Sequence, residues 1–188
     1  CKKLAIHVGA IDVPDESRRI HKNPTPRMGG LAIFFSFLFG YLVFGDISTK
    51  MISVLIGSFI LVLVGAFDDI KSIPGKYKLL CQLAATLIVV FYGGFLLQEI
   101  DAFGIYINFN GWAYPITIFF IMGCVNCINF IDGMDGLSSG ICSICFLTVG
   151  VIAAITNKLT GLDVLLAFSA LGATLGYLKH NFHPAKIF

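Results

Sequence analysis

Six apolar runs dominate this sequence, and each approaches the length that an α-helix needs to cross a lipid bilayer, roughly 17–25 residues. The runs lie at about 31–45, 51–67, 79–97, 113–131, 137–156 and 161–178. The first is short unless Met28, Gly29 and Gly30 extend it. Composition agrees, because 57% of the residues are hydrophobic and 13% are charged, whereas a soluble domain is roughly 25% charged. The sequence therefore predicts an all-α, polytopic integral membrane helix bundle with six transmembrane helices, in a single domain over residues 1–188.

The loops between these runs differ in charge, which indicates how the chain is oriented. If the runs alternate in direction, one side of the membrane holds residues 1–30, 68–78, 132–136 and 179–188. Of the 13 Lys and Arg residues, all but Lys50 and Lys158 fall on that side. Because cytoplasmic loops are enriched in Lys and Arg, we expect that side to face the cytoplasm. The protein would then be a multi-pass protein of the inner or plasma membrane.

The loop from Gln98 to Trp112 lies on the opposite, external side in this topology. Its residues alternate between apolar and polar over 105–109, and it contains Asn110-Gly111, a pair typical of tight turns. This pattern favours a small external β-hairpin.

Charge and cysteine placement argue against two other classes of function. The net charge of +2, with no continuous basic block, does not support binding to nucleic acid. Cys124, Cys127, Cys142 and Cys145 approach the spacing of a four-thiolate zinc site. All four lie inside apolar runs, where cysteine behaves as a small hydrophobic residue. We therefore expect no zinc there.

Amides and carboxylates recur every three residues at the end of the fourth run, at Asn126, Asn129, Asp132 and Asp135. One continuous helix would splay them, because each step of three falls ~60° short of a full turn. Gly133 and Gly136 instead predict that one helix stops near Asp132 and that Asp135 caps the next helix at Leu137. Taken alone, a motif of this kind is more often a plain polar turn between two helices.

Three further polar motifs share the predicted cytoplasmic side with this turn. They are Asp68-Asp69 at the end of the second run, residues 18–30 before the first, and residues 179–186 after the sixth. Polar motifs placed by chance would scatter over both sides, so their convergence favours one common site. Gly29 and Gly30 would allow close contact with a ligand or a neighbouring helix.

The residue types in this predicted site suit phosphate chemistry. Carboxylates near membrane depth are costly and usually functional, and Mg²⁺ is commonly held by one or two carboxylates together with substrate phosphate oxygens. Lys22, Arg27, Lys76 and Lys78 supply positive charge that would complement the remaining phosphate oxygens. Each basic residue also has a simpler interpretation, because such residues satisfy topology and contact anionic lipids at a membrane boundary.

An ion-coupled membrane transporter is the main alternative from another class, since carriers also place carboxylates in broken helices. A carrier needs its site near the middle of the membrane. Here the acidic residues gather at one boundary, and no charged residue interrupts the middle of any run. The pattern therefore favours an enzyme, with a structural or lipid-binding protein as a third interpretation.

Five ordered blocks resemble the polyprenyl-phosphate N-acetylhexosamine-1-phosphate transferases. They are HKNPTPRMGG at 21–30, GAFDD at 65–69, KYKLLCQ at 76–82, NCINFIDGMDGL at 126–137 and NFHPAKIF at 181–188. The PTPR form at 24–27 resembles the bacterial branch that transfers GlcNAc-1-phosphate from UDP-GlcNAc to undecaprenyl phosphate, the first membrane step of cell-envelope polysaccharide synthesis. The phospho-MurNAc-pentapeptide transferases of the same family are the alternative.

The resemblance implies attack of a lipid phosphate on the β-phosphorus of a UDP-sugar, with Mg²⁺, or Mn²⁺ in its place, bridging the diphosphate. It implies that Asp68 deprotonates the lipid phosphate or acts as nucleophile, and that Asp69 shares this acidic, metal-binding site. Asn181 would lie near the metal, Lys22 near the nucleotide, and Phe188 would stack on uracil. The remaining expected substrate-binding residues are Asn126, Asn129, Asp132, Asp135, Arg27 and Lys76. Fold analogy further suggests a homodimer.

The ends of the chain depart from the family pattern. After Phe188 the family continues with Met-Gly-Asp-x-Gly-Ser, whose Asp is a principal metal ligand, and later with a histidine-rich cytoplasmic loop. The family also has a helix before the residue that corresponds to Cys1. We therefore expect this sequence to be part of a longer transferase.

Overall fold

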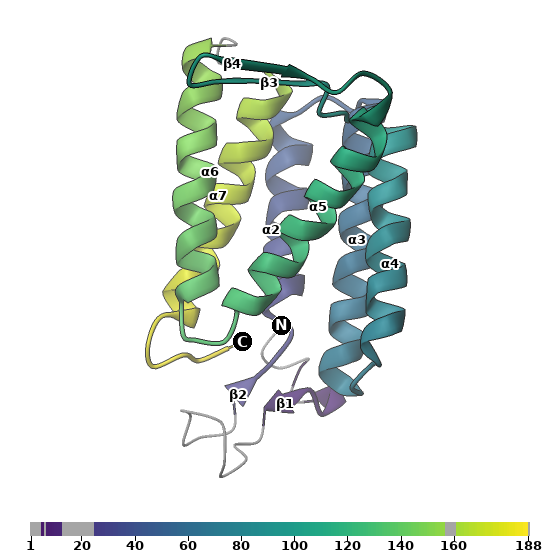
Figure 1. The fold of residues 1–188 in the computed structure, drawn as a ribbon. Helices are drawn as coiled ribbons and strands as arrows, with labels where there is room; N and C mark the ends of the chain where they lie inside the picture. The colour runs from purple at the N-terminus through teal and green to yellow at the C-terminus, as the bar shows by residue number, and fades with distance from the viewer. Residues whose placement is uncertain (1–4, 6, 13–24, 157–160, 188) are drawn as a thin grey trace. The chain divides into compact units, whose positions relative to one another are not determined.

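The computed structural model describes residues 5, 7–12, 25–156 and 161–187. Within these residues each of the six apolar runs forms a helix, as predicted (Figure 1). The helices are α2 (Gly29–Phe44), α3 (Thr49–Ile70), α4 (Gly75–Leu87), α5 (Ala113–Ile131), α6 (Leu137–Thr156) and α7 (Leu162–Asn181). A π-helical turn, η1 (Ile88–Tyr92), continues α4. The helices form because backbone polar groups in lipid have to be satisfied within the segment itself.

Five helical segments of the described chain are long and apolar enough to cross a membrane. They are Thr49–Ile70, Gly75–Tyr92, Asn110–Ile131, Leu137–Thr156 and Leu162–Asn181. Helix α2 is apolar but has 16 residues, which gives about 24 Å of helix against a hydrocarbon core of about 30 Å. Helix α2 begins at Gly29, so Gly29 and Gly30 extend the first apolar run and Met28 does not. The all-α, multi-pass membrane architecture is confirmed.

Small residues lie between the helices, and large apolar residues point outward. Phe39, Phe119 and Phe130 are 71%, 81% and 87% exposed, respectively. The buried set is rich in Ala, Ser and Thr. This distribution is expected in a bilayer, because lipid solvates large apolar side chains as well as protein does, and helices associate through small residues that allow close packing.

The chain divides into two compact units, which are described separately. Unit 1 contains Cys1–Asp46, Gly65–Ser72 and Ile131–Phe188, and unit 2 contains Ile47–Val64 and Ile73–Phe130. Helix α3 contributes its first part to unit 2 and its last six residues to unit 1. The expectation of a single domain over residues 1–188 stays a prediction.

In unit 1, helix α7 packs against both α6 and α2. Ser143 Oγ donates to Thr174 Oγ1 across the α6–α7 interface at 3.1 Å, and both side chains are buried. Gly150 packs closely against the ring of Phe168. A short antiparallel ladder pairs β1 (Ile11–Asp12) with β2 (Thr25–Pro26) just before α2. The Arg27 N–H donates to the Ala10 carbonyl at 2.9 Å, which extends this ladder toward α2.

In unit 2, Gly57 of α3 lies against Val89 and the Ala85 carbonyl. The predicted small hairpin is confirmed as β3 (Glu99–Ala102) paired antiparallel with β4 (Ile105–Asn108), and its placement on the external side stays a prediction. Its turn lies at Phe103 (φ 55°) and Gly104 (φ 76°), the two positive φ angles that a two-residue type I′ hairpin turn needs. Asn110-Gly111, the pair that favoured a hairpin in the sequence, instead lies in the 3-10 turn η2 (Asn110–Trp112).

Candidate functional site

Asp69, near the end of α3, holds the segment that leads into α2. The Met28 N–H donates to Asp69 Oδ2 at 3.1 Å, and Arg27 Nη1 lies 4.0 Å from Asp69 Oδ1. Met28 has φ 82°, a left-handed conformation that is uncommon outside glycine. The hydrogen bond from its own N–H to a carboxylate therefore fixes an unusual backbone geometry directly before α2. Asp68 and Asp132 both lie within electrostatic range of Asp69.

The predicted helix break at 132–136 is present. Helix α5 ends at Ile131 and α6 begins at Leu137, and Gly136 has the positive φ (69°) that a residue without a Cβ tolerates. The Gly136 carbonyl accepts from the Gly140 N–H at 2.9 Å, the first hydrogen bond of α6. Asp132 is exposed, and its Oδ1 accepts from Ser138 Oγ at 2.6 Å in the first turn of α6.

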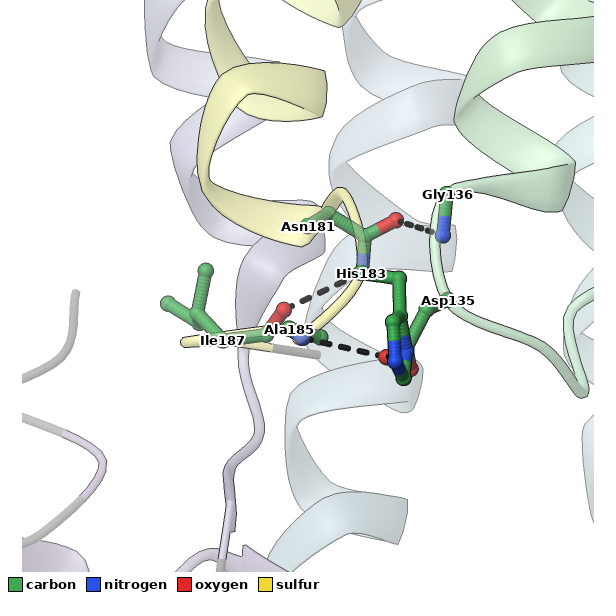
Figure 2. A network of polar contacts seen from close by, with 6 residues as sticks. All are labelled: Asp135, Gly136, Asn181, His183, Ala185 and Ile187. Atoms are coloured by element: carbon green, nitrogen blue, oxygen red, sulfur yellow. Dashed lines mark hydrogen bonds and ion pairs between the residues drawn. The ribbon is translucent and has the colours of Figure 1, made fainter. Parts of the chain in front are cut away.

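Asp135 joins this turn to the segment that follows α7 (Figure 2). Its Oδ2 accepts from the Ala185 N–H at 3.0 Å and lies 2.9 Å from Nδ1 of His183. The carboxylate is nearly buried, with 6% of the side chain exposed, whereas the His183 side chain is 74% exposed. The sequence predicted that Asp135 would cap α6. That role stays a prediction, and in the structure the Oδ2 of Asp135 contacts residues about 50 positions later in the chain.

Asn181 is the buried centre of the same network, with 2% of its surface exposed. Its Oδ1 accepts from the Gly136 N–H and from Ser139 Oγ, both at 3.0 Å, and its Nδ2 donates to the Ile187 carbonyl at 3.1 Å. Figure 2 shows the amide between the turn on one side and the C-terminal segment on the other. Asn181 therefore fixes three parts of unit 1, namely the end of α7, the 132–136 turn and residues 182–187.

Tyr177 is a site residue that the sequence did not single out. Its ring lies against Gly29, so closely that any Cβ at position 29 would overlap the ring. Its Oη donates to the Ile187 carbonyl at 3.4 Å, and Asp132 and Asp69 lie within electrostatic range. The only advance signal was Gly29 itself, whose predicted close approach to a neighbouring helix is confirmed. Gly30, predicted to do the same, faces open space, because a Cβ at that position would meet no atom within 4 Å in the described structure.

Unit 1 thus brings together Arg27, Asp68, Asp69, Asp132, Asp135 and Asn181 from the expected site residues. Asn126, Asn129 and Lys76 belong to unit 2. There, Asn126 Nδ2 donates to Gln82 Oε1 at 3.0 Å and to the Met122 carbonyl at 2.8 Å, while Asn129 and Lys76 are exposed. Lys22 and Phe188 lie outside the described residues.

A metal ion would find a partial set of ligands in unit 1. The described residues contain no group of three or more His, Cys, Asp or Glu side chains that could hold a metal. Asp68 and Asp69 are consecutive, half-buried carboxylates, and Mg²⁺ accepts one or two carboxylates when phosphate oxygens and water complete its shell. The donor set therefore fits a magnesium ion that arrives with a phosphorylated ligand. The five described cysteines are free thiols, and the absence of zinc at four of them stays a prediction.

Known proteins resemble this chain over its whole length. A probable undecaprenyl-phosphate N-acetylglucosaminyl 1-phosphate transferase from Bacillus subtilis (strain 168) is 39% identical over 193 residues, which cover 100% of this chain and 52% of that protein. A decaprenyl-phosphate N-acetylglucosaminephosphotransferase from Mycobacterium tuberculosis (strain ATCC 25618 / H37Rv) is 31% identical over 205 residues, with 100% and 50% coverage. A phospho-N-acetylmuramoyl-pentapeptide-transferase from Bacillus licheniformis is 34% identical over 196 residues, with 94% and 59% coverage.

The chain spans about half the length of the curated relatives that it matches. Residues 51–188 match the family model described as glycosyl transferase family 4. This range contains the Asp68-Asp69 pair, the 132–136 turn and all of the Asn181 network. With most of the chain matched, and with relatives named as the resemblance predicted, the chain belongs to glycosyl transferase family 4.

Proposed function

We propose that the protein transfers GlcNAc-1-phosphate from UDP-GlcNAc to undecaprenyl phosphate, giving undecaprenyl-diphospho-GlcNAc and UMP. The observation that carries this proposal is the gathering, in unit 1, of four segments that are far apart in the chain. Arg27 and Met28 contact Asp69, and the 132–136 turn contacts residues 181–185. Tyr177 joins these two groups, because its ring packs on Gly29 and its Oη donates to the Ile187 carbonyl. Such a site suits phosphoryl transfer, in which positioning and charge neutralisation supply most of the catalysis.

The roles proposed for individual residues follow from their surroundings. Asp68 is the candidate to deprotonate the lipid phosphate or to attack as nucleophile, a role that rests on the resemblance and on its position next to Asp69. Asp69 would share the acidic site and hold Arg27 close to it, where the guanidinium can neutralise a phosphate oxygen. Asp68 and Asp69 would together hold Mg²⁺, or Mn²⁺, and the ion would supply further charge neutralisation at the diphosphate.

The residues proposed to bind the nucleotide have two kinds of support. Asp132 is exposed and within electrostatic range of Asp69, so its carboxylate can meet a ligand at the acidic site. Asp135 and Asn181 are buried in protein contacts in this structure, which supports a role in shaping the wall of the site. Asn126, Asn129, Lys22, Lys76 and Phe188 keep their proposed substrate-binding roles, which rest on the resemblance.

Two alternatives receive different support. A phospho-MurNAc-pentapeptide transferase is a second candidate, because the Bacillus licheniformis relative of that name is 34% identical to this chain. The PTPR form at 24–27 favours the GlcNAc branch. An ion-coupled transporter is disfavoured by the position of the acids, since Asp69 is the penultimate residue of α3 and Asp132 directly follows α5, whereas a carrier site lies at the membrane midplane.

The test measures UMP release by the full-length protein in membranes that contain a polyprenyl phosphate. We expect release from UDP-GlcNAc that requires undecaprenyl phosphate, and we expect little release from UDP-MurNAc-pentapeptide. A preference for the pentapeptide substrate would move the protein to the second candidate. UMP release that does not depend on the lipid, or no release with either sugar nucleotide, would contradict the proposal. Right-side-out and inside-out vesicles would show whether the site faces the cytoplasm, as the distribution of basic residues favours.

A further inference from the structure

We propose that the β3–β4 hairpin binds the lipid surface, with one face resting on the boundary between headgroups and acyl chains. The hairpin belongs to unit 2 and contributes no residue to the proposed chemistry. The inference therefore goes beyond the proposed transferase activity and does not depend on it.

The register of the hairpin separates apolar from polar side chains. Directly paired residues share a face, and successive residues alternate between faces. Ile100 pairs with Ile107, and Ala102 with Ile105, so one face is wholly apolar. The opposite face carries the pairs Glu99–Asn108 and Asp101–Tyr106. The hairpin is thus amphipathic, yet both strands are exposed along their whole length.

The described part of the chain leaves the apolar face of the hairpin largely uncovered. Ile100, Ile105 and Ile107 are 40%, 61% and 46% exposed, and Phe103 at the tip is fully exposed. A soluble hairpin of this kind would lose stability in water, because isolated two-stranded hairpins need an apolar surface to rest on. A surface of matching chemistry should therefore cover this face.

The connections of the hairpin place it beside a membrane. The span Gly75–Tyr92 ends shortly before β3, and the span Asn110–Ile131 starts directly after β4. The ends of both spans expose aromatic rings, at Tyr92, Trp112 and Tyr114. Such rings gather at headgroup level in membrane proteins, so the hairpin continues an interfacial aromatic belt. Lipid is the surface that lies within reach of both its ends.

Internal contacts hold the hairpin in a defined orientation. On its polar face, Tyr106 Oη donates to Glu99 Oε2 at 2.6 Å, and Asn108 Nδ2 donates to Tyr106 Oη at 3.4 Å. At its base, the Phe109 N–H donates to the Gln98 carbonyl at 2.9 Å. Just before it, the Leu97 N–H donates to Thr117 Oγ1 of α5 at 2.8 Å. The polar face is therefore organised by its own hydrogen bonds, which suits contact with water.

Charge determines which kind of lipid contact is expected. Residues 98–112 contain Glu99 and Asp101 and no Lys or Arg. Electrostatic attraction to anionic lipids needs basic residues, so burial of apolar side chains is the driving force. Binding should then be insensitive to the fraction of anionic lipid and to salt, unlike that of a basic amphipathic helix.

The experiment compares neighbouring residues on the two faces. Tryptophan reporters are introduced as Phe103→Trp, Ile107→Trp and Tyr106→Trp in full-length protein carrying Trp112→Phe, and the emission of that parent is subtracted. Tyr106 and Ile107 are consecutive and both exposed, so Tyr106→Trp is a matched control for the polar face. The proteins are reconstituted in phosphatidylcholine vesicles with or without lipid that is brominated high on the acyl chains.

We expect brominated lipid to remove most of the emission of the Phe103→Trp and Ile107→Trp reporters and to leave that of Tyr106→Trp nearly unchanged. The quenching should not change when part of the phosphatidylcholine is replaced by anionic lipid or when salt is raised. Equal, weak quenching of all three reporters would overturn the proposal and indicate that protein, from this chain or a second copy, covers the apolar face. Quenching that requires anionic lipid would overturn the apolar mode of binding. Circular dichroism of each variant verifies that the helices are intact.

Discussion

Asp69 offers the sharpest test of the candidate site, because the structure separates its chemical role from its positional one. The Asp69→Asn change keeps an oxygen that can accept from the Met28 N–H but removes the charge. The Asp69→Ala change removes both. If the Asp69 carboxylate is catalytic or binds the metal, both variants should lose activity. If Asp69 only holds Met28, only Asp69→Ala should lose activity.

The expected cost to stability can be worked from the contacts. A hydrogen bond to a charged acceptor contributes about 1.5–3 kcal/mol, and charged hydrogen bonds are about twice as strong as neutral ones. The Arg27 contact is 4.0 Å long with side chains 31% and 29% exposed, so it adds only ~0.2–1 kcal/mol. Removing the charge also removes the cost of burying it and its repulsion from Asp68 and Asp132, which offsets these losses. Asp69→Asn should therefore change the free energy of unfolding by less than ~1 kcal/mol, and Asp69→Ala, which also loses the acceptor for the Met28 N–H, should lower it by about 1–3 kcal/mol.

Activity should respond differently from stability. Acid–base participation is worth ~10²–10⁴-fold, so we expect both variants of the full-length enzyme to lose at least ~100-fold in UMP release. The assay measures that rate and the unfolding free energy on the same preparations in one detergent. If Asp69→Asn keeps activity within a few fold of the parent while Asp69→Ala loses it, Asp69 acts only by positioning Met28. A large loss of stability in Asp69→Asn would refute the roles assigned to the two contacts.

Three further predictions use other parts of the structure. Gly29→Ala should destabilise the fold because its Cβ would overlap the ring of Tyr177. Gly30→Ala meets open space, so it should be neutral or stabilising by up to ~1 kcal/mol, and thermal melting of the two variants tests this difference. Asn181→Leu should cost about 3 kcal/mol from three lost hydrogen bonds at ~1 kcal/mol each, and an unchanged melt would contradict the network. Cysteines introduced at Ser72 and Asn108 should label from opposite sides of the membrane, and labelling from one side would disprove the topology.

The helices of this protein could be predicted from the sequence because their cause is local. Each apolar run satisfies its own backbone in a bilayer by forming a helix, whatever it later packs against. The same holds for the break at 132–136, where Gly136 adopts a positive φ, and for the hairpin, whose alternation is a local pattern. The turn of the hairpin lies at Phe103-Gly104, which have the two positive φ angles, although Asn-Gly is the commoner pair in such turns.

The tertiary structure alone decided which polar groups meet. Met28 binds Asp69 across 41 residues, Asn181 binds Gly136 across 45, and Ala185 binds Asp135 across 50. A local sequence pattern does not predict which carboxylate or amide oxygen accepts from a distant N–H, because the choice of partner depends on how α2, α6 and α7 pack. For the same reason the sequence did not indicate the contacts of Asp135 with His183 and Ala185 and passed over Tyr177, whose role exists only because α7 lies against Gly29. Local periodicity determined the elements of this protein, and packing determined the contacts of the candidate site.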